Sequence, residues 1–514
     1  MIYRSLQADV RIPSQSLTEF VLESGRARAS DPALVDGLTG RAVTYGELRE
    51  KVRRVAAGLA ALGIRKGDVV ALCSPNSPEF AIVFHAVARL GAILTTMNPA
   101  NTAHELAKQL TDAKARMLVS AASLADKARA AIDESRGEIE LITVEEVPGA
   151  RSLAAIAIDA EPPAVSIDPD NDVVVLPYSS GTTGLPKGVM LTHRNLIANL
   201  LQADAVEGDA FTALVGVLPF FHIYGMVVIL NFGLMRGATI VTLPRFELEP
   251  FLKVLQDWPI TLAHIVPPIA LALAKHPLVD QYDLRGVATL FSGAAPLGVA
   301  LSKAIRQRLG ITVKQGYGMT ETSPVTHYSD GARDGTVGRL VASTECRIVD
   351  VASGLDAAAG QPGEVWIRGP QVMKGYLNNP EATARTLDRD GWLHTGDIGV
   401  IDAEGYLTIV DRLKELIKVK GYQVAPAELE ALLLKHPRIA DAAVIPLPDD
   451  ECGEVPKAII VARGDLTADE VIAYVQAQVA HYKRIRHVAF VDAIPKSASG
   501  KILRRVLVER ERAL

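Results

Sequence analysis

The sequence of 514 residues has few cysteines, little excess charge and no visible targeting signal. Cys73, Cys346 and Cys452 are odd in number and far apart, so they form no metal-ligand pattern and are typical of a reducing compartment. A net charge of −5 gives no basic surface for nucleic acid or for an anionic membrane. The N-terminus lacks a basic segment followed by an apolar one, so we expect a cytoplasmic protein.

One stretch without charged residues, Phe211–Met235, is long enough to span a bilayer. Pro219, His222 and Asn231 within it argue against a membrane helix, as does the absence of flanking basic clusters. We therefore predict a buried strand, loop and helix in this segment, and no membrane insertion. A membrane-spanning helix is the alternative.

The first third of the chain alternates helix and strand signals. Thr44 with Glu47, and Thr102 with Glu105, have the spacing of capping boxes at the starts of helices. Apolar runs such as Val69–Cys73 stand between the helical segments and predict strands. This rhythm resumes after residue 172 and predicts an α/β fold of parallel sheets covered by helices.

The pattern changes twice in the second half. Residues 335–410 contain short strands separated by turns, which favours a small β-barrel-like unit. The remaining residues have the pattern of a compact α+β module. We therefore expect an N-terminal domain over residues 1–411, which includes the β-rich unit, and a small mobile C-terminal domain over 412–514. The boundary is predicted at Asp411–Lys414.

The most informative segment is 178–188, which holds three glycines, four hydroxyl side chains and one lysine after an apolar strand. Glycines let backbone N–H groups turn inward around an anion, and the hydroxyls and the lysine add donors and charge. It is not a P-loop, because Pro186 replaces the glycine before Lys187. We predict a hairpin-like loop that holds a polyphosphate; a solvated turn is the alternative. The predicted phosphate contacts are Ser179, Ser180, Gly181, Thr182, Thr183, Gly184 and Lys187.

Other segments carry groups that suit a nucleotide. Gln315–Glu321, expected as a loop after a strand, offers the aromatic face of Tyr317 for adenine and oxygen atoms for Mg²⁺. Asp397 is a carboxylate suited to the hydroxyls of a ribose. Lys501 ends a glycine-preceded turn, and four cations lie between residues 411 and 423. Each has a simple alternative as a core residue, a turn residue or a solvated face.

In this order and at these intervals, the motifs resemble the adenylate-forming superfamily of acyl-CoA synthetases, peptide-synthetase adenylation domains and insect luciferases. The resemblance covers about residues 17 to 507. It looks closest to the 4-coumarate–CoA ligase branch, including its bacterial members, because Pro219–Tyr224 and Gln315–Glu321 are typical of that branch. It implies two half-reactions: a carboxylate and ATP give acyl-AMP and pyrophosphate, and a thiol then displaces AMP. ATP, Mg²⁺ and coenzyme A are the implied cofactors.

The resemblance also implies roles for individual residues. A carboxylate that attacks the α-phosphate needs positive charge placed in advance, and Lys501 would supply it. Lys414 would be the hinge for a rotation of the C-terminal domain that admits the thiol. The implied catalytic residues are Lys501, His222 and Lys418; the metal ligands are Glu321 and Thr320; the nucleotide and coenzyme A contacts are Gly293, Ala294, Ala295, Gln315, Gly316, Tyr317, Gly318, Thr320, Asp397, Arg412, Lys414, Lys420, Gly421, Gln423 and Arg245.

The chain departs from plant members of this branch. Trp366 replaces a cysteine, Phe291 stands where a lysine is common, and Val228 stands where a serine is common. The implied acyl pocket is therefore mostly apolar, with the lining Tyr224, Val228, Phe291, Pro324 and Val325. We expect a cinnamate- or coumarate-type acid, or another hydrophobic acid, without a strict requirement for a phenolic hydroxyl. An apolar pocket rejects an added hydroxyl by only about 10²-fold.

Four functions remain open at this point. The first is an ATP-dependent acid–CoA ligase acting on a small carboxylic acid. The second keeps the adenylation but loads a medium-chain or aryl acyl group onto a carrier-protein thiol. A luciferase-like oxygenase and a non-catalytic nucleotide-binding regulator are the others. The presence of Lys187, Glu321 and Lys501 together argues against a regulator, since binding alone does not need all three.

Overall fold

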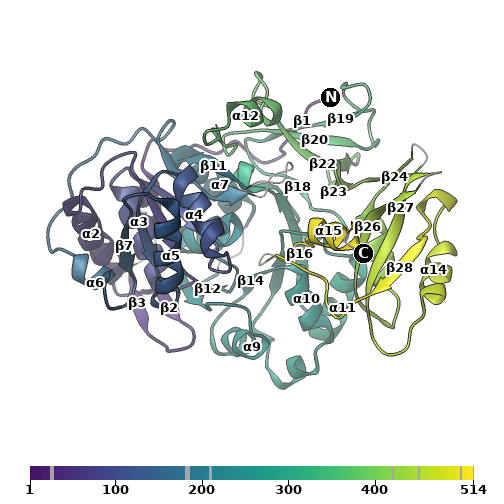
Figure 1. Cartoon of the computed structure of the whole chain (residues 1–514), viewed down its shortest axis with the longest axis horizontal. Helices are drawn as coiled ribbons and strands as arrows, with labels where there is room; N and C mark the ends of the chain where they lie inside the picture. The colour runs from purple at the N-terminus through teal and green to yellow at the C-terminus, as the bar shows by residue number, and fades with distance from the viewer. Residues whose placement is uncertain are drawn as a thin grey trace.

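The structure is a computed structural model that describes residues 1–23, 28–179, 186–207, 211–419, 422–449, 452–497 and 500–512. For residues 422, 423 and 512 only the backbone is described. Five sheets organise the described chain. Figure 1 shows the N-terminal half, in purple to teal, as sheets packed with helices, the green β-rich unit above it, and the yellow C-terminal unit at one side.

The largest sheet has nine strands, in the order β10-β11-β9-β5-β4-β6-β7-β8, with β21 beside β11. Its central strands run parallel, and the two capping boxes predicted at Thr44 and Thr102 are present. The strands are β4 Val69–Cys73, β5 Ile93–Met97, β6 Ala115–Ser120, β7 Glu140–Thr143, β8 Arg151–Ser152, β9 Val173–Val175, β10 Tyr178–Ser179, β11 Lys187–Thr192 and β21 Gly375–Tyr376. The helices of this part of the chain are α1 Leu17–Leu22, α2 Tyr45–Ala61, α3 Pro78–Arg89, α4 Ala103–Asp112, α5 Ala125–Ser135, α6 Leu153–Ile156 and α7 His193–Val206.

A four-stranded sheet, β12-β13-β2-β3, holds the uncharged stretch Phe211–Met235. This stretch forms β12, a loop, the π-helix η2 and the first four residues of α8, and Phe211 and the residues of β12, of η2 and of this part of α8 are buried. The prediction of a buried strand, loop and helix is therefore confirmed. No helix of the described chain is both long and apolar enough to cross a membrane. The elements are β2 Pro32–Asp36, β3 Ala42–Thr44, β12 Ala213–Gly216, η2 Tyr224–Asn231, α8 Phe232–Arg236 and β13 Thr239–Thr242.

The third sheet, β14-β15-β16-β17-β18, is parallel across its first three strands and antiparallel beyond. Strand β16 is longer than the sequence predicts, so Gln315–Gly318 belong to the strand. The reason is that Gly316 and Tyr317 pair with β17 after the pairing with β15 has ended. The elements are α9 Leu248–Asp257, β14 Leu262–Ile265, α10 Pro267–Lys275, β15 Thr289–Ser292, α11 Val299–Leu309, β16 Thr312–Gly318, β17 Val325–Tyr328 and β18 Arg339–Leu340.

The β-rich unit expected over 335–410 is an antiparallel sheet of five strands, β1-β19-β20-β22-β23. Its first edge strand comes from the N-terminus, where Tyr3 pairs with Cys346, a contact that the sequence pattern does not indicate. The elements are β1 Tyr3–Arg4, β19 Glu345–Val349, β20 Gly363–Arg368, α12 Pro380–Thr386, β22 Leu393–Ile401 and β23 Leu407–Arg412.

The C-terminal unit has a sheet of its own, β25-β24-β27-β26 with β28 beside β27, and its own apolar core. Gly500 of this unit lies against Pro268, on the helix that follows strand β14 of the third sheet. A Cβ at Gly500 would be only 2.8 Å from Cδ of Pro268. Figure 1 shows α15 between this unit and the rest of the chain. The elements are β24 Ile417–Val419, β25 Tyr422–Val424, α13 Pro426–Leu433, β26 Ile439–Asp449, β27 Gly453–Ala462, α14 Ala468–Gln476, β28 His487–Phe490 and α15 Arg504–Arg512.

Candidate active site

The predicted phosphate loop lies in a β-hairpin, as expected. Strand β10 pairs antiparallel with β11, and Thr192 caps the following helix α7. Because the loop joins two strands, phosphates bound there would not lie on a helix N-terminus. The predicted contacts Ser180, Gly181, Thr182, Thr183 and Gly184 lie outside the described residues.

A buried carboxylate, Glu321, faces the base of this hairpin. Glu321 is only 3% exposed. Its Oε1 accepts hydrogen bonds from Oγ of Ser179 at 2.8 Å and from the hydroxyl of Tyr376 at 2.9 Å. Thr320 precedes it in the short 3₁₀ helix Thr320–Thr322. Both bonds end on Oε1, so Oε2 is the oxygen that suits a cation. No cluster of three or more His, Cys, Asp or Glu side chains fit for a metal occurs in the described ranges. The carboxylate of Glu321 and the hydroxyl of Thr320 are oxygen ligands of the kind that suits Mg²⁺, which is bound through one or two carboxylates together with phosphates and water.

Lys187 lies on the same side of the hairpin as Glu321. Its ammonium nitrogen is 4.8 Å from the centre of the Tyr376 ring, a cation–π contact. Burial lowers the pKa of Lys187; the charge of Glu321 opposes this shift, and the charge of Lys414 adds to it. Lys414 belongs to the predicted hinge. The cations of the hairpin and of the hinge therefore act on one another electrostatically, as expected where both face an anion.

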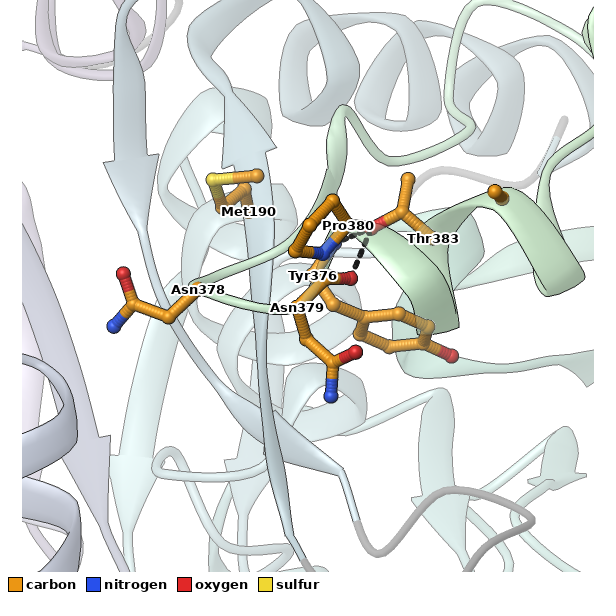
Figure 2. Close-up of a pocket in the computed structure, with 7 residues that line it drawn as sticks. Met190, Tyr376, Asn378, Asn379, Pro380 and Thr383 are labelled. Atoms are coloured by element: carbon orange, nitrogen blue, oxygen red, sulfur yellow. Dashed lines mark hydrogen bonds between the residues drawn. The ribbon is translucent and has the colours of Figure 1, made fainter.

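Tyr376 also borders a surface hollow of about 360 Å³, shown in Figure 2. The backbone N–H of Tyr376 donates to Oγ1 of Thr383 at 2.9 Å, which ties β21 to α12. The lining residues are Met190, Tyr376, Asn378, Asn379, Pro380, Thr383 and Ala384. Because Tyr376 bonds Glu321, this hollow lies beside the candidate phosphate site.

A second buried carboxylate, Asp397, lies where β22 pairs with β23. Asp397 is opposite Arg412 in the ladder, and its Oδ1 accepts a hydrogen bond from Nε of Arg412 at 2.8 Å. Its Oδ2 accepts one from the hydroxyl of Tyr317 at 2.7 Å. Burial and the charge of Asp397 raise the pKa of Tyr317, so this tyrosine is a neutral donor. Each carboxylate oxygen has two lone-pair sites, so Asp397 retains capacity for the hydroxyls of a ribose.

Lys501 approaches this group from the C-terminal unit. It is half-buried, and its backbone is held in a turn by Ser497, whose Oγ accepts a bond from the Lys501 N–H at 3.1 Å. Burial lowers the pKa of Lys501, and the charge of Arg412 adds to this shift; Glu415 and Asp397 oppose it. The charges of Arg412 and Asp397, the two residues predicted to hold the ribose, thus both act on Lys501.

Other predicted contacts are exposed or lie outside the described residues. Lys418 is exposed and pairs with Gln423 in the β24–β25 ladder. For Gln423 only the backbone is described. Arg245 is exposed and forms an ion pair with Glu247. Lys420 and Gly421 lie outside the described residues. The thiol-step roles of these residues stay predictions.

Two of the residues predicted to line an acyl pocket are in contact, because the hydroxyl of Tyr224 donates a hydrogen bond to the carbonyl oxygen of Phe291 at 3.1 Å. The Tyr224 ring covers Gly293, where a Cβ would be 2.8 Å from Cε1 of the tyrosine, and Phe291 covers Gly316 in the same way at 2.6 Å from its Cζ. Val228, Pro324 and Val325 are buried. Ala294, beside Gly293, adopts a left-handed φ of 69°, which marks a tight turn of the predicted adenine loop.

His222 precedes the tyrosine of this group. Its Nδ1 accepts a hydrogen bond from the N–H of Tyr224 at 3.3 Å, and burial lowers the pKa of the imidazole to about 4. At neutral pH the side chain is therefore uncharged. It can position a carboxylate or thiol by hydrogen bonding, but it does not supply positive charge.

Sequence reasoning missed several residues of this region. Tyr376, which bonds Glu321, comes 55 residues after it without a motif of its own. His264, on β14, lies against Tyr224 and Phe291. Arg504 pairs with Glu430 at 2.7 Å and with Glu415, which links α15 to the segment after the hinge. No local pattern marks these residues, because their partners are distant along the chain.

Comparisons with known proteins identify the family of this chain. Residues 22–377 match the family of AMP-binding enzymes, and residues 428–501 match the AMP-binding enzyme C-terminal domain. 4-Coumarate–CoA ligase 5 of Oryza sativa subsp. japonica is 44% identical over 98% of this chain and 96% of its own length. 4-Coumarate–CoA ligase 2 of Petroselinum crispum is 45% identical over 99% and 96%.

Solved structures give the same result for the fold. ATP-bound MatB from Rhodopseudomonas palustris has a TM-score of 0.87 at 30% identity and covers 97% of this chain and 99% of its own. An anthranilate CoA ligase, AuaEII, in complex with anthranoyl-AMP has a TM-score of 0.88 at 26% identity, with 98% and 99% covered. The family model matches most of the chain, and relatives are 44–45% identical over nearly its whole length. The chain therefore belongs to the AMP-binding enzyme family.

Proposed function

We propose that the chain is an ATP-dependent carboxylic acid–CoA ligase that works through an acyl-AMP intermediate. The observation that carries the proposal is the position of Lys501. This lysine comes from the C-terminal unit and acts electrostatically on Arg412 and Asp397, while Lys187 acts on Glu321. Two cations from separate units thus border a group of residues suited to a nucleotide.

The first half-reaction joins two anions, since a carboxylate oxygen attacks the α-phosphorus and pyrophosphate leaves. Positive charge placed beforehand lowers the barrier to this encounter. In this proposal Lys501 would stabilise the charge that develops at the α-phosphate, and Lys187 would hold the leaving phosphates. Asp397 and Arg412 would hold the ribose, and Tyr317, which donates to Asp397, would face the adenine, so the reacting phosphorus stays in place. Mg²⁺ bound at Glu321 and Thr320 would neutralise phosphate charge.

The second half-reaction needs a path for the thiol. In our proposal the C-terminal domain, over residues 412–514, rotates about Lys414 and withdraws Lys501. The comparison with one neighbour in two states supports this motion. MatB has a TM-score of 0.87 to this chain with ATP bound and 0.76 without it, at the same identity and coverage. In our proposal this difference arises because the two domains of this chain have the relative position that suits the adenylation step.

The proposed substrate is a hydrophobic acid, of cinnamate or coumarate type. Tyr224, Phe291 and Val228 provide a mostly apolar lining, and the relatives named above are 4-coumarate–CoA ligases. Proposed partners are therefore the acid, ATP and coenzyme A. Loading of a carrier-protein thiol is the second candidate; the whole-length similarity to CoA ligases favours coenzyme A.

A panel of carboxylic acids tests the proposal directly. Purified chain is given ATP, Mg²⁺ and each acid, with and without coenzyme A, and pyrophosphate release and thioester formation are measured. We expect acid-dependent pyrophosphate release and a thioester only with coenzyme A. Release with no transfer to coenzyme A would favour a carrier-protein acceptor, and no release with any acid would contradict the proposal.

A further inference from the structure

A buried polar atom near Tyr224 and Phe291 has no hydrogen-bond partner in the described chain. His264, on β14, is 2% exposed, and its Nε2 has no hydrogen-bond partner in the described chain. A buried polar atom without a partner costs free energy, so an unpaired one calls for an explanation. One explanation is that a ligand provides the missing partner.

His264 lies among residues of the proposed acyl pocket. In the parallel ladder it stands opposite Phe291, and the two rings are 5.5 Å apart. The ring of Tyr224 meets it edge-on at 5.8 Å. The imidazole is therefore bordered by two of the aromatic side chains that would surround the acyl group.

The bonds around His264 decide which of its nitrogens carries the proton. The hydroxyl of Tyr224 donates to the carbonyl oxygen of Phe291 at 3.1 Å, because a carbonyl can only accept. The same hydroxyl oxygen is 3.4 Å from Nδ1 of His264, so Nδ1 carries the hydrogen in this weaker contact. Burial lowers the pKa of His264 to about 3, so the ring is neutral at pH 7. Nε2 is then an acceptor with a free lone pair.

From this arrangement we propose that His264 is a specificity-determining residue that accepts a hydrogen bond from a hydroxyl group on the ring of the acyl substrate. The inference rests on the proposed function and names its substrate class: hydroxylated aryl-propenoic acids. An acceptor selects donors, so a free hydroxyl is favoured over a methyl ether, which cannot donate. His264 thus restores a polar contact in a lining where Phe291 and Val228 are both apolar.

The test compares three acids: 4-hydroxycinnamate, cinnamate and 4-methoxycinnamate. The measured quantity is kcat/KM for pyrophosphate release by the full chain, with KM for ATP measured alongside. We expect wild type to prefer 4-hydroxycinnamate over both others. In His264→Met the preference for 4-hydroxycinnamate over cinnamate should fall about tenfold, the effect of one hydrogen bond. The loss should come mainly from KM for the hydroxylated acid, with KM for ATP unchanged.

Two further variants separate recognition from packing. His264→Gln keeps an acceptor and should retain part of the preference. His85→Leu is the matched control, because His85 is also fully buried with an unpartnered Nε2 but lies on α3. It should leave the ratio of the three acids unchanged.

Two results would overturn the inference alone: a wild type without preference for the hydroxylated acid, or an unchanged ratio in His264→Met. If that variant fails to fold, the wild-type ratio and His264→Gln decide: a preference in His264→Gln that is reduced but still present would be support, and a ratio equal to that of wild type would overturn the inference. No pyrophosphate release with these acids or a wider panel would overturn the proposed function and the inference together.

Discussion

The nucleotide side and the acyl side of the candidate site are built differently. On the nucleotide side, Asp397 and Glu321 are buried carboxylates whose oxygens already accept bonds from Tyr317, Arg412 and Tyr376. On the acyl side, aromatic rings cover glycines. The first arrangement fixes charge and geometry for one common ligand. The second would select by shape and by the acceptor on His264, so small changes in it would alter which acid is used.

Lys501→Ala is the variant with the largest expected effect, and it breaks the nucleotide side alone. Loss of one transition-state contact typically lowers the rate by about 10²–10³-fold, so adenylation should be nearly abolished. Thioester formation from pre-made acyl-AMP should remain largely intact. Arg505→Ala, at an exposed cation four positions on, is the control. Equal loss in both half-reactions would contradict this division of roles.

Lys414→Pro tests the link between the two half-reactions. Proline fixes φ, so the hinge should lose freedom and the coenzyme A step should slow several-fold more than the ATP step. Single-turnover measurements of acyl-AMP formation and of its consumption separate the two. Lys414→Ala removes the charge that acts on Lys187 and keeps the backbone free. Equal slowing of both steps in the proline variant would argue against rotation.

Gly293→Ala tests the shape of the acyl side. The new Cβ would lie 2.8 Å from Cε1 of Tyr224, so the ring must move, and overpacking of this kind costs about 1–3 kcal/mol. We expect KM for aromatic acids to rise more than KM for ATP. Gly298→Ala, in the same loop, meets no atom within 4 Å and is the control. Equal kinetics in the two variants would show that Tyr224 does not border the acid.

A smaller effect is expected from pH. Burial lowers the pKa of His222 to about 4 and of His264 to about 3, below the value near 6.5 of an unfolded chain. Below pH 6.5 the unfolded state binds protons that the folded state does not, so the free energy of unfolding falls as pH decreases. Each such histidine contributes a slope of up to about 1.4 kcal/mol per pH unit down to its folded pKa. Denaturant unfolding between pH 7 and pH 5 measures this slope. His264→Met should lower it by up to about 1.4 kcal/mol per pH unit, the contribution of one bound proton.

Much of the fold could be predicted because its signals are local. The capping boxes at Thr44 and Thr102, the apolar run Val69–Cys73 and the hairpin before Thr192 appear where the sequence placed them. The sequence does not predict the full length of β16. Its last residues pair with β17, beyond the point where its pairing with β15 ends. The pairing of Tyr3 with Cys346 was missed for the same reason.

The sequence by itself determined the alternation of helices and strands, the hairpin that carries Lys187 and the motifs that place this chain in its family. Those features depend on neighbouring residues, whose spacing the sequence states directly. The tertiary structure alone decided that Tyr376 meets Glu321, that Tyr317 and Arg412 meet at Asp397, and that His264 lies against Tyr224. Such contacts join distant segments, and they form only when separate strands pack side by side and exclude water from the polar groups between them.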